Sequence, residues 1–274
     1  MTIQTAILTP NGLTSTQYRA ESLAEAAQHE PTGVYTVTRT YQTGKALLLD
    51  AHLDRLEESA RLENIPVELD RESLRRGLRE LIRQSGYEES RFRITIPTAE
   101  PHCVYLALEP LQPVPPEVRQ NGVQVITIHA KRENPIAKST TWMEQRQKAI
   151  QGRMEGMYEA FLVDDSENIL EGTSSNFYAV LGGVLHTAGE GILKGISRIV
   201  LLEVAQGVVP ISFSPVSVKN IPDLEEAFLT SSSRGVIPIV EIDGQKIGSG
   251  NPGTITLDLQ RRYDAWTDAN IKPI

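Results

Sequence analysis

Three short segments of this chain carry residue types that could hold and use an aldehyde cofactor. Lys138 is an isolated lysine, Glu171 opens the stretch Glu171-Gly-Thr-Ser-Ser-Asn176-Phe-Tyr178, and a glycine turn at Gly195 leads into an apolar helical pattern. A lysine amine can bind an aldehyde as a Schiff base, a carboxylate can keep a pyridine nitrogen protonated, and a glycine turn that opens a helix can bind phosphate. Together the three segments indicate a pyridoxal 5'-phosphate site.

Lys138 lies in a stretch that begins irregular, at Asn134-Pro135, and becomes helix-like through Ala149. To attack an aldehyde near neutral pH, its amine must lose a proton, and burial or a neighbouring cation promotes this loss. The ordinary alternative is a solvated loop lysine, because most lysines are exposed. Position alone leaves both interpretations open.

Glu171 ends a β-like run and is followed by small polar residues before the apolar run Phe177 to Val180. This order places a carboxylate at a strand end, where it could hold a pyridinium nitrogen. Asn176 could orient the phenolic oxygen of the cofactor. A surface turn would use the same residue types.

A phosphate group has several candidate partners. The segment Gly195-Ile196-Ser197 opens a helical pattern whose first backbone N–H groups favour an anion. The run Thr230-Ser-Ser-Ser-Arg-Gly follows a strand and could add further donors, and Arg55 offers a guanidinium that suits phosphate. The glycine spacing fits neither a Walker A loop nor a dinucleotide fingerprint, so a single phosphate group is expected.

Composition limits the remaining choices. The 274 residues are 40% hydrophobic with a formal net charge of −8, which favours a folded protein and argues against nucleic acid as the main partner. Cys103 is the only cysteine, and the five histidines show no ligand spacing, so no metal site is expected. The N-terminus lacks a signal-peptide pattern and no window is apolar long enough to span a bilayer. We therefore expect a cytoplasmic protein.

Local patterns predict a mixture of helices and strands. Asp70 could cap a helix that carries Leu74, Leu78, Leu81 and Ile82, and further helices are expected over 197–206 and 253–266. Gly182-Gly183 indicates a hairpin turn. The expected strands cover 104–108, 123–128, 160–163, 176–180, 226–230 and 236–240. The prolines at 110, 113, 115 and 116 interrupt regular structure, so we expect an N-terminal α+β domain over 1–110, a Pro-rich linker over 111–119 and a β-rich domain over 120–274.

In their order along the chain, these motifs resemble those of the class IV pyridoxal-phosphate-dependent aminotransferases. This group contains branched-chain aminotransferases, D-amino-acid aminotransferases and aminodeoxychorismate lyase. The segment from Gly33 to Tyr41 resembles the family's first active-site strand, and His52-Leu-Asp-Arg55-Leu resembles its phosphate-arginine motif. The resemblance implies a fold type IV enzyme with a small N-terminal α+β domain, a larger barrel-like C-terminal domain, and a homodimer.

The same resemblance assigns roles to individual residues. Lys138 would be the catalytic lysine, and the substrate carboxylate would bind to Arg39 or Arg234. Trp142 follows the lysine where the family often carries tyrosine or arginine, and Pro97-Thr98 lacks the arginine-glycine ending typical of D-amino-acid enzymes. The implied cofactor-binding residues are Arg55, Lys138, Glu171, Asn176, Gly195, Ile196, Ser197, Ser232 and Ser233, and the implied substrate-binding residues are Tyr35, Arg39, Trp142 and Arg234.

The expected reaction is transamination between an amino acid, with the branched-chain type favoured, and a 2-oxo acid. Lys138 would serve both to hold the cofactor and to move the α-proton. Two alternatives stay open: β-elimination that releases pyruvate, as in aminodeoxychorismate lyase, and a non-catalytic protein that binds pyridoxal phosphate or another metabolite.

Overall fold

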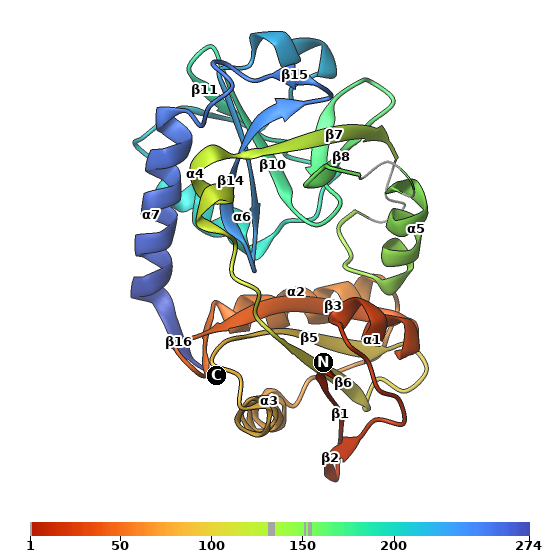
Figure 1. The fold of residues 1–274 in the computed structure, drawn as a ribbon. Coiled ribbons are helices and arrows are strands. Elements are labelled where there is room, and N and C mark those ends of the chain that lie inside the picture. The colour runs from red at the N-terminus through yellow and green to blue at the C-terminus, as the bar shows by residue number, and fades with distance from the viewer. Residues whose placement is uncertain (1, 131–134, 151, 153–154) are drawn as a thin grey trace. The chain divides into compact units, whose positions relative to one another are not determined.

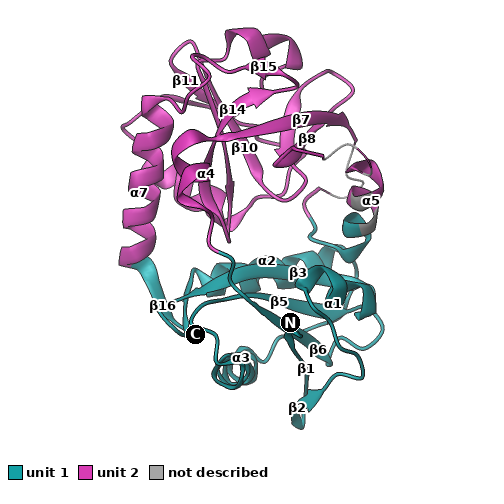
Figure 2. Ribbon diagram, viewed as in Figure 1, with its two compact units in different colours: residues 1–112, 137–143, 270–274 teal, residues 113–136, 144–269 magenta. Residues whose placement is uncertain are grey.

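A computed structural model describes residues 2–130, 135–150, 152 and 155–274 of the chain. The chain forms two compact units (Figure 2). Unit 1 contains residues 1–112, 137–143 and 270–274, and unit 2 contains residues 113–136 and 144–269. The short segment 137–143 therefore packs with unit 1, although its neighbours on both sides belong to unit 2.

Unit 1 is built on one antiparallel sheet with the strand order β16-β4-β3-β5-β6-β1-β2 (Figure 1). Strands β3 and β5 form its centre, and the register sets Tyr35 directly opposite Thr95. The elements are β1 (Gln4–Thr9), β2 (Gly12–Ser15), α1 (Leu23–His29), β3 (Gly33–Tyr41), β4 (Lys45–Leu47), α2 (Leu49–Leu62), α3 (Arg71–Ser85), β5 (Ser90–Pro97), β6 (Val104–Pro110) and β16 (Ile271–Pro273).

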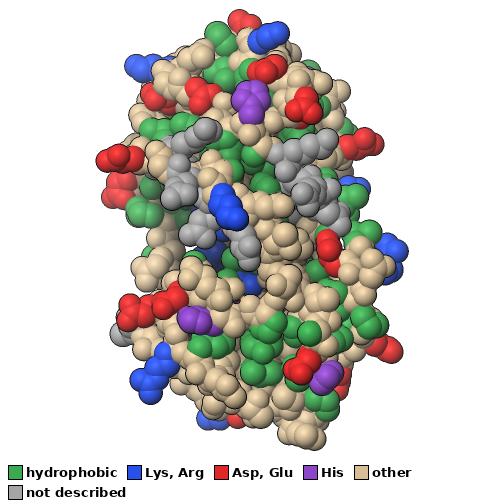
Figure 3. Space-filling view, turned by 90° about the vertical axis from the view of Figure 1, so that its right-hand side faces the viewer, with side chains coloured by type: hydrophobic (Ala, Val, Ile, Leu, Met, Phe, Trp, Pro, Cys, Tyr) green, Lys and Arg blue, Asp and Glu red, His purple; other side chains and the backbone are tan. Residues whose placement is uncertain are grey.

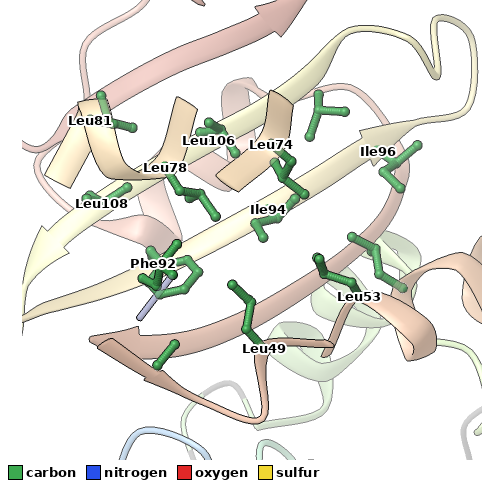
Figure 4. Packing of buried hydrophobic residues seen from close by; sticks show 14 of the residues in the cluster. Leu49, Leu53, Leu74, Leu78, Leu81, Phe92, Ile94, Ile96, Leu106 and Leu108 are labelled. Carbon is green, nitrogen blue, oxygen red and sulfur yellow. The ribbon is translucent and has the colours of Figure 1, made fainter. Parts of the chain in front are cut away.

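The hydrophobic core of unit 1 lies between one face of this sheet and the helices α2 and α3. Alternate residues of β5, namely Phe92, Ile94 and Ile96, meet leucines of both helices (Figure 4). Since strand side chains alternate between faces, the residues between them point the other way. Each fully buried side chain of this kind contributes about 1.5–3 kcal/mol, so this cluster fixes the register of β3 against β5.

Helix α3 forms as the sequence predicts. Asp70 caps it by accepting a hydrogen bond from the Ser73 backbone N–H at 2.9 Å, and its leucine spacing keeps one face buried. The helix ends at Gly86, whose positive φ of 66° is accessible to glycine at little cost.

Unit 2 is a β-barrel with surrounding helices. Strand β9 pairs with both β8 and β10, which closes the ring β10-β13-β14-β7-β8-β9. The elements are α4 (Pro116–Asn121), β7 (Val123–His129), α5 (Thr140–Ile150, which begins in unit 1), β8 (Glu159–Val163), β9 (Ile169–Gly172), β10 (Asn176–Leu181), β11 (Val184–His186), α6 (Ile196–Val204), β12 (Ile211–Ser212), the 3-10 helix η1 (Val218–Asp223), β13 (Glu226–Ser231), β14 (Gly235–Ile242), β15 (Gln245–Lys246) and α7 (Thr254–Asn270).

The predicted strands and helices of unit 2 are confirmed, as is the mixed α+β fold. Gly182 and Gly183 have φ values of 59° and 71° and join β10 to β11, because glycine supplies the positive φ of a primed hairpin turn. Regular structure resumes inside the expected linker, since Pro116 is the first residue of α4. At that position the missing N–H of proline costs nothing.

The surface carries charges of both signs. On the face drawn in Figure 3, acidic and basic side chains are interspersed over a largely neutral surface. In the part of the chain that the structure describes, no helix combines the length and the apolar character that a membrane span requires.

Candidate active site

The backbone of Lys138 is fixed by hydrogen bonds to distant parts of unit 1. Its carbonyl accepts from the Tyr35 N–H at 2.9 Å, and its own N–H donates to the Ser59 hydroxyl of α2 at 3.2 Å. The Thr140 hydroxyl accepts from the Gly33 N–H at 3.0 Å. Segment 137–143 is thereby docked on the edge of β3 at one point and on α2 at another.

The side chain of Lys138 lies against an aromatic ring, and the residue is half-buried. Its Nζ atom is 4.9 Å from the centroid of the Tyr35 ring, and the Arg93 guanidinium carbon lies 4.7 Å from the same centroid. Tyr35 is buried, so the ring is a fixed wall beside the lysine. The structure thus brings Lys138 and Tyr35 together, as the resemblance implies.

Helix α2 presents a second cation to this region. Arg55 Nη2 donates to the Thr36 hydroxyl at 3.3 Å, and the same hydroxyl is 2.9 Å from Nδ1 of the buried His52. Burial, assisted by the charges of Arg55 and Lys138, holds the pKa of His52 well below its ordinary value of 6.5. His52 is therefore a neutral ring beside two cationic side chains.

Arg39 and Trp142 lie in different settings from Lys138. Arg39 is at the far end of β3, roughly 13 Å along the strand from Tyr35, and it pairs with Glu89 and covers the Tyr41 ring. Trp142 is buried in the first turn of α5. The structure does not bring Arg39 to Lys138.

Unit 2 holds Glu171 and Asn176 side by side. They are cross-strand partners on β9 and β10, and both are buried, with Glu171 only 3% exposed. Glu171 Oε2 accepts from the Leu193 N–H at 3.1 Å, and Asn176 Nδ2 donates to the Leu193 carbonyl at 2.8 Å. One backbone segment therefore orients both side chains.

The glycine turn that follows this segment leads directly into α6. Gly195 is the N-cap residue without a side-chain cap, and the first turn of the helix contains no acidic residue. The first N–H groups of a helix have no partner within it, so they are available to an anion. A Cβ atom at Gly195 would lie 2.3 Å from Asn176 Oδ1, so only glycine leaves this approach open.

Hydroxyl groups surround the start of α6. Ser197 Oγ donates to Thr230 Oγ1 at 3.3 Å, and the Tyr178 hydroxyl is also 3.3 Å from Thr230 Oγ1. Burial raises the pKa of Tyr178, which keeps its hydroxyl protonated. Ser232 and Ser233 follow in the half-buried turn between β13 and β14. Residues that are distant in sequence thus form one hydroxyl-rich region.

Arg234 is held by a buried carboxylate that the sequence analysis did not identify. Its Nη1 lies 2.7 Å from Glu159 Oε2, Nη2 donates to Ser174 Oγ at 3.0 Å, and Nε donates to Ser231 Oγ at 2.8 Å. Glu159 also accepts from the Ser174 N–H at 2.6 Å. This cluster ties the loop after Glu171 to the turn that carries Ser232 and Ser233.

The proton affinity of Glu159 follows from these contacts. Burial by itself would raise the pKa of Glu159, but Arg234 and the Ser174 hydrogen bonds hold it below its ordinary value. A sequence signal for this residue existed, because Glu159 opens an otherwise apolar buried strand. A charge in such a strand must have a partner.

The donor set of unit 2 fits a phosphorylated pyridine. It offers a buried carboxylate for a ring nitrogen, a helix start without acidic residues for a phosphate, and a bare glycine that leaves room for a close approach. Among the described residues, no group of three or more His, Cys, Asp or Glu side chains could hold a metal ion. The roles of the individual site residues stay predictions.

Comparisons with known proteins agree with a class of enzyme that transfers amino groups. A model of the family described as amino-transferase class IV matches residues 33–242. A Methanocaldococcus jannaschii protein, provisionally named a branched-chain-amino-acid aminotransferase, is 30% identical over 261 residues, covering 88% of this chain and 89% of its own. A D-alanine aminotransferase of Bacillus licheniformis is 31% identical over 243 residues, with coverages of 83% and 85%.

The fold has similar relatives among solved structures. A branched-chain aminotransferase from the thermophilic archaeon Thermoproteus uzoniensis, crystallised with norvaline, has a TM-score of 0.80 at 21% identity, covering 100% of this chain and 99% of its own. A T.th. branched-chain amino acid aminotransferase with pyridoxamine 5'-phosphate has a TM-score of 0.79 at 21% identity and covers 98% of each chain.

With the family match spanning most of the sequence, this chain belongs to the class IV aminotransferases. It is a pyridoxal-phosphate-dependent enzyme of amino-acid metabolism, as the motifs predict.

Proposed function

We propose that this enzyme transfers an amino group from a branched-chain amino acid to a 2-oxo acid, with Lys138 as the catalytic residue. The observation that supports this proposal best is the buried Glu171, which is fixed by Leu193 beside Asn176 and the start of α6. A buried carboxylate with such a fixed orientation suits a protonated pyridine nitrogen.

The cofactor-binding roles follow the chemistry of each group. When bound, pyridoxal phosphate supplies an aldehyde that captures the substrate amino group and a ring that withdraws electrons from the substrate α-carbon. We assign the ring nitrogen to Glu171 and the phenolic oxygen to Asn176. We assign the phosphate to the N–H groups of Ile196 and Ser197 behind Gly195, the hydroxyls of Ser232 and Ser233, and the guanidinium of Arg55.

Lys138 has two tasks in this proposal. Its Nζ atom holds the cofactor before the substrate arrives, and as a free amine it then removes the proton from the substrate α-carbon and delivers it to the other side of the new bond. Tyr35 supports both tasks, because its buried ring limits where the amine can move.

For the substrate carboxylate, we favour Arg234 over Arg39. Arg234 is bonded to Ser231 next to the Ser232–Ser233 turn, whereas Arg39 pairs with Glu89 at the distant end of β3. Tyr35 and Trp142 are proposed as apolar walls of the substrate site. The absence of the arginine-glycine ending at Pro97-Thr98 supports a branched-chain donor over a D-amino acid.

Two further expectations from the sequence stay proposals, namely a homodimer and a cytoplasmic location. Sedimentation of the purified protein tests the first, since a dimer doubles the chain mass of 30.3 kDa. Cell fractionation tests the second.

The proposed function has a direct test in two parts. Borohydride reduction of the holoenzyme followed by peptide mapping should label Lys138, and a label elsewhere would refute its role. A panel of L-leucine, L-valine and D-alanine with 2-oxoglutarate should give glutamate fastest with the branched-chain donors. Pyruvate release without glutamate would support the lyase alternative, and no spectral response to any amino acid would support a non-catalytic binder.

A further inference from the structure

A buried polar row crosses the face of the unit 1 sheet that lies opposite the hydrophobic core. Arg93 Nε donates to Thr95 Oγ1 at 2.9 Å, and Thr95 Oγ1 donates to Glu30 Oε2 at 2.5 Å. Arg93 Nη2 is 3.2 Å from the same carboxylate oxygen, and the two side chains are only 2% and 0% exposed. A charged pair is thus sealed inside unit 1.

Burial of such a pair is expensive for the protein. Removing two charges from water costs several kcal/mol for each ion, and a well-packed apolar pair of similar size is often as stable. Burial raises the pKa of Glu30, while Arg93 opposes this shift, so the carboxylate itself gains little from its setting. The pair is therefore poorly explained by stability and calls for a functional explanation.

The sheet register shows where this pair acts. Tyr35 is directly opposite Thr95 across β3 and β5, and Arg93 is one position further along the same face. The Arg93 guanidinium carbon and the Lys138 Nζ atom both lie within 5 Å of the Tyr35 ring centroid, at 4.7 Å and 4.9 Å. The two cationic groups are thus within about 10 Å of each other, a range over which charges interact in a protein interior.

We propose that Arg93, fixed by Glu30 and Thr95, is a positioning residue that holds the Tyr35 ring against Lys138 and keeps a permanent positive charge near the reacting amine. The inference rests on the proposed role of Lys138 and adds to it the residues that set its proton affinity. A fixed cation nearby favours the neutral amine, which is the form that attacks a carbonyl and accepts a proton.

Other groups of unit 1 also face Lys138. They are Tyr35 on β3 and His52 and Arg55 on α2. His52 is neutral at physiological pH because its pKa lies well below 6.5, and Arg55 is permanently charged. Glu30 carries the charge opposite to that of Arg93. Removing the acid and removing the base should therefore shift Lys138 in opposite directions.

The experiment is a pH titration of the absorbance of the bound cofactor in the full-length holoenzyme, whose midpoint reports protonation at the Lys138 nitrogen. Arg93→Met should raise the midpoint by about one pH unit, and Glu30→Gln should lower it by a similar amount. Arg93→Lys keeps the charge and should stay closer to the wild type. Arg91→Met, on the same strand but half-exposed and paired with Glu109, is the matched control and should leave the midpoint unchanged.

A second readout separates positioning from substrate binding. Arg93→Met should lower kcat about tenfold with little change in KM, because the amine rather than the substrate contact is affected. Shifts of the midpoint in the same direction for Arg93→Met and Glu30→Gln, or no shift in either, would overturn the proposal. If Arg93→Met does not fold, Glu30→Gln and Arg93→Lys still decide the direction.

Failure of this inference is distinguishable from failure of the proposed function. If reductive labelling of the wild type maps to a lysine other than Lys138, the catalytic assignment itself is wrong. If Lys138 is labelled and the variants leave the midpoint unmoved, only the role of Arg93 and Glu30 is refuted.

Discussion

The two units hold their candidate site residues in different ways. In unit 2, Glu171 and Asn176 lie on adjacent strands that are joined by residues 173–175, so local structure is enough to bring them together. In unit 1, Lys138 is positioned by β3 and α2, which are far away in sequence. Unit 2 thus supplies fixed donors and an acid, and unit 1 supplies a reactive amine whose properties depend on tertiary contacts.

Each unit also buries an arginine–glutamate pair, and the two pairs differ in proton affinity. Burial wins at Glu30, whose pKa is raised, whereas Glu159 has a lowered pKa despite its burial. The difference lies in the donors: Glu159 accepts from a backbone N–H, two hydroxyls and Arg234, while Glu30 is bonded through the Thr95 hydroxyl and faces Arg93. The number of donors, more than burial itself, decides whether a buried carboxylate stays ionised.

The largest expected effect is that of removing the reactive amine from unit 1. Lys138→Ala should lower kcat by about 10³-fold or more, because the same nitrogen holds the cofactor and moves the proton. The intact donors of unit 2 should still retain cofactor non-covalently in this variant. Steady-state kinetics and a cofactor-binding titration check both points, with the exposed Lys148→Ala as control. Near-normal turnover in Lys138→Ala would break the assignment of chemistry to unit 1.

The next effect concerns the acid of unit 2. Glu171→Gln should lower kcat by about 10² to 10³-fold with cofactor binding largely preserved, because the amide cannot hold the ring nitrogen protonated. Single-turnover measurement of α-proton removal is the appropriate assay. The exposed Glu190→Gln is the matched control. Equal rates for Glu171→Gln and the wild type would remove the assigned role of this carboxylate.

A comparison of the two buried pairs sharpens the contrast in stability. Glu159→Gln should reduce the free energy of unfolding by about 3 kcal/mol, since it removes a favourably ionised carboxylate and leaves Arg234 without its partner. Glu30→Gln should cost less, because burial already disfavours the ionised form of Glu30. Chemical denaturation of both variants gives the order. A larger loss for Glu30→Gln would show that the donor count does not explain the difference.

The smallest expected effect is a pH dependence that arises in unit 1. His52 is neutral in the folded protein at a pH where the unfolded chain, with an ordinary pKa of 6.5, takes up a proton. The stabilisation is therefore present above about pH 6.5 and is lost as the pH falls below it, by at most about 1.4 kcal/mol per pH unit. Denaturation between about pH 5 and 8 should show a shallower slope for His52→Gln, and the exposed His102→Gln should keep the wild-type slope.

Much of the fold was predictable because its signals are local. The capped helix after Asp70, the hairpin at Gly182-Gly183 and the apolar strands of unit 2 all follow from patterns within short segments. Family membership and cofactor class were predictable for a similar reason, since Glu171 to Tyr178 and Gly195 to Arg198 are contiguous motifs.

The supporting residues were not predictable in the same way. Glu159, Arg93 and Glu30 belong to no contiguous motif, and each matters only through a partner on another element. Arg39 illustrates the converse, because its motif position suggests the site while its ion pair with Glu89 holds it at the distant end of β3. Pairing across elements is decided by sheet register and packing, which a residue pattern along one segment does not encode.

The amino-acid sequence by itself determined which groups this enzyme possesses: a lysine, a strand-end carboxylate and a glycine turn at a helix start. Those choices are written in short segments, because capping, turn formation and anion binding depend on near neighbours. Only the tertiary structure decided that residues 137–143 dock on β3 and α2, and that Tyr35 lies between Lys138 and a buried ion pair. The physical reason is that charge, burial and orientation are properties of surroundings assembled from the whole chain.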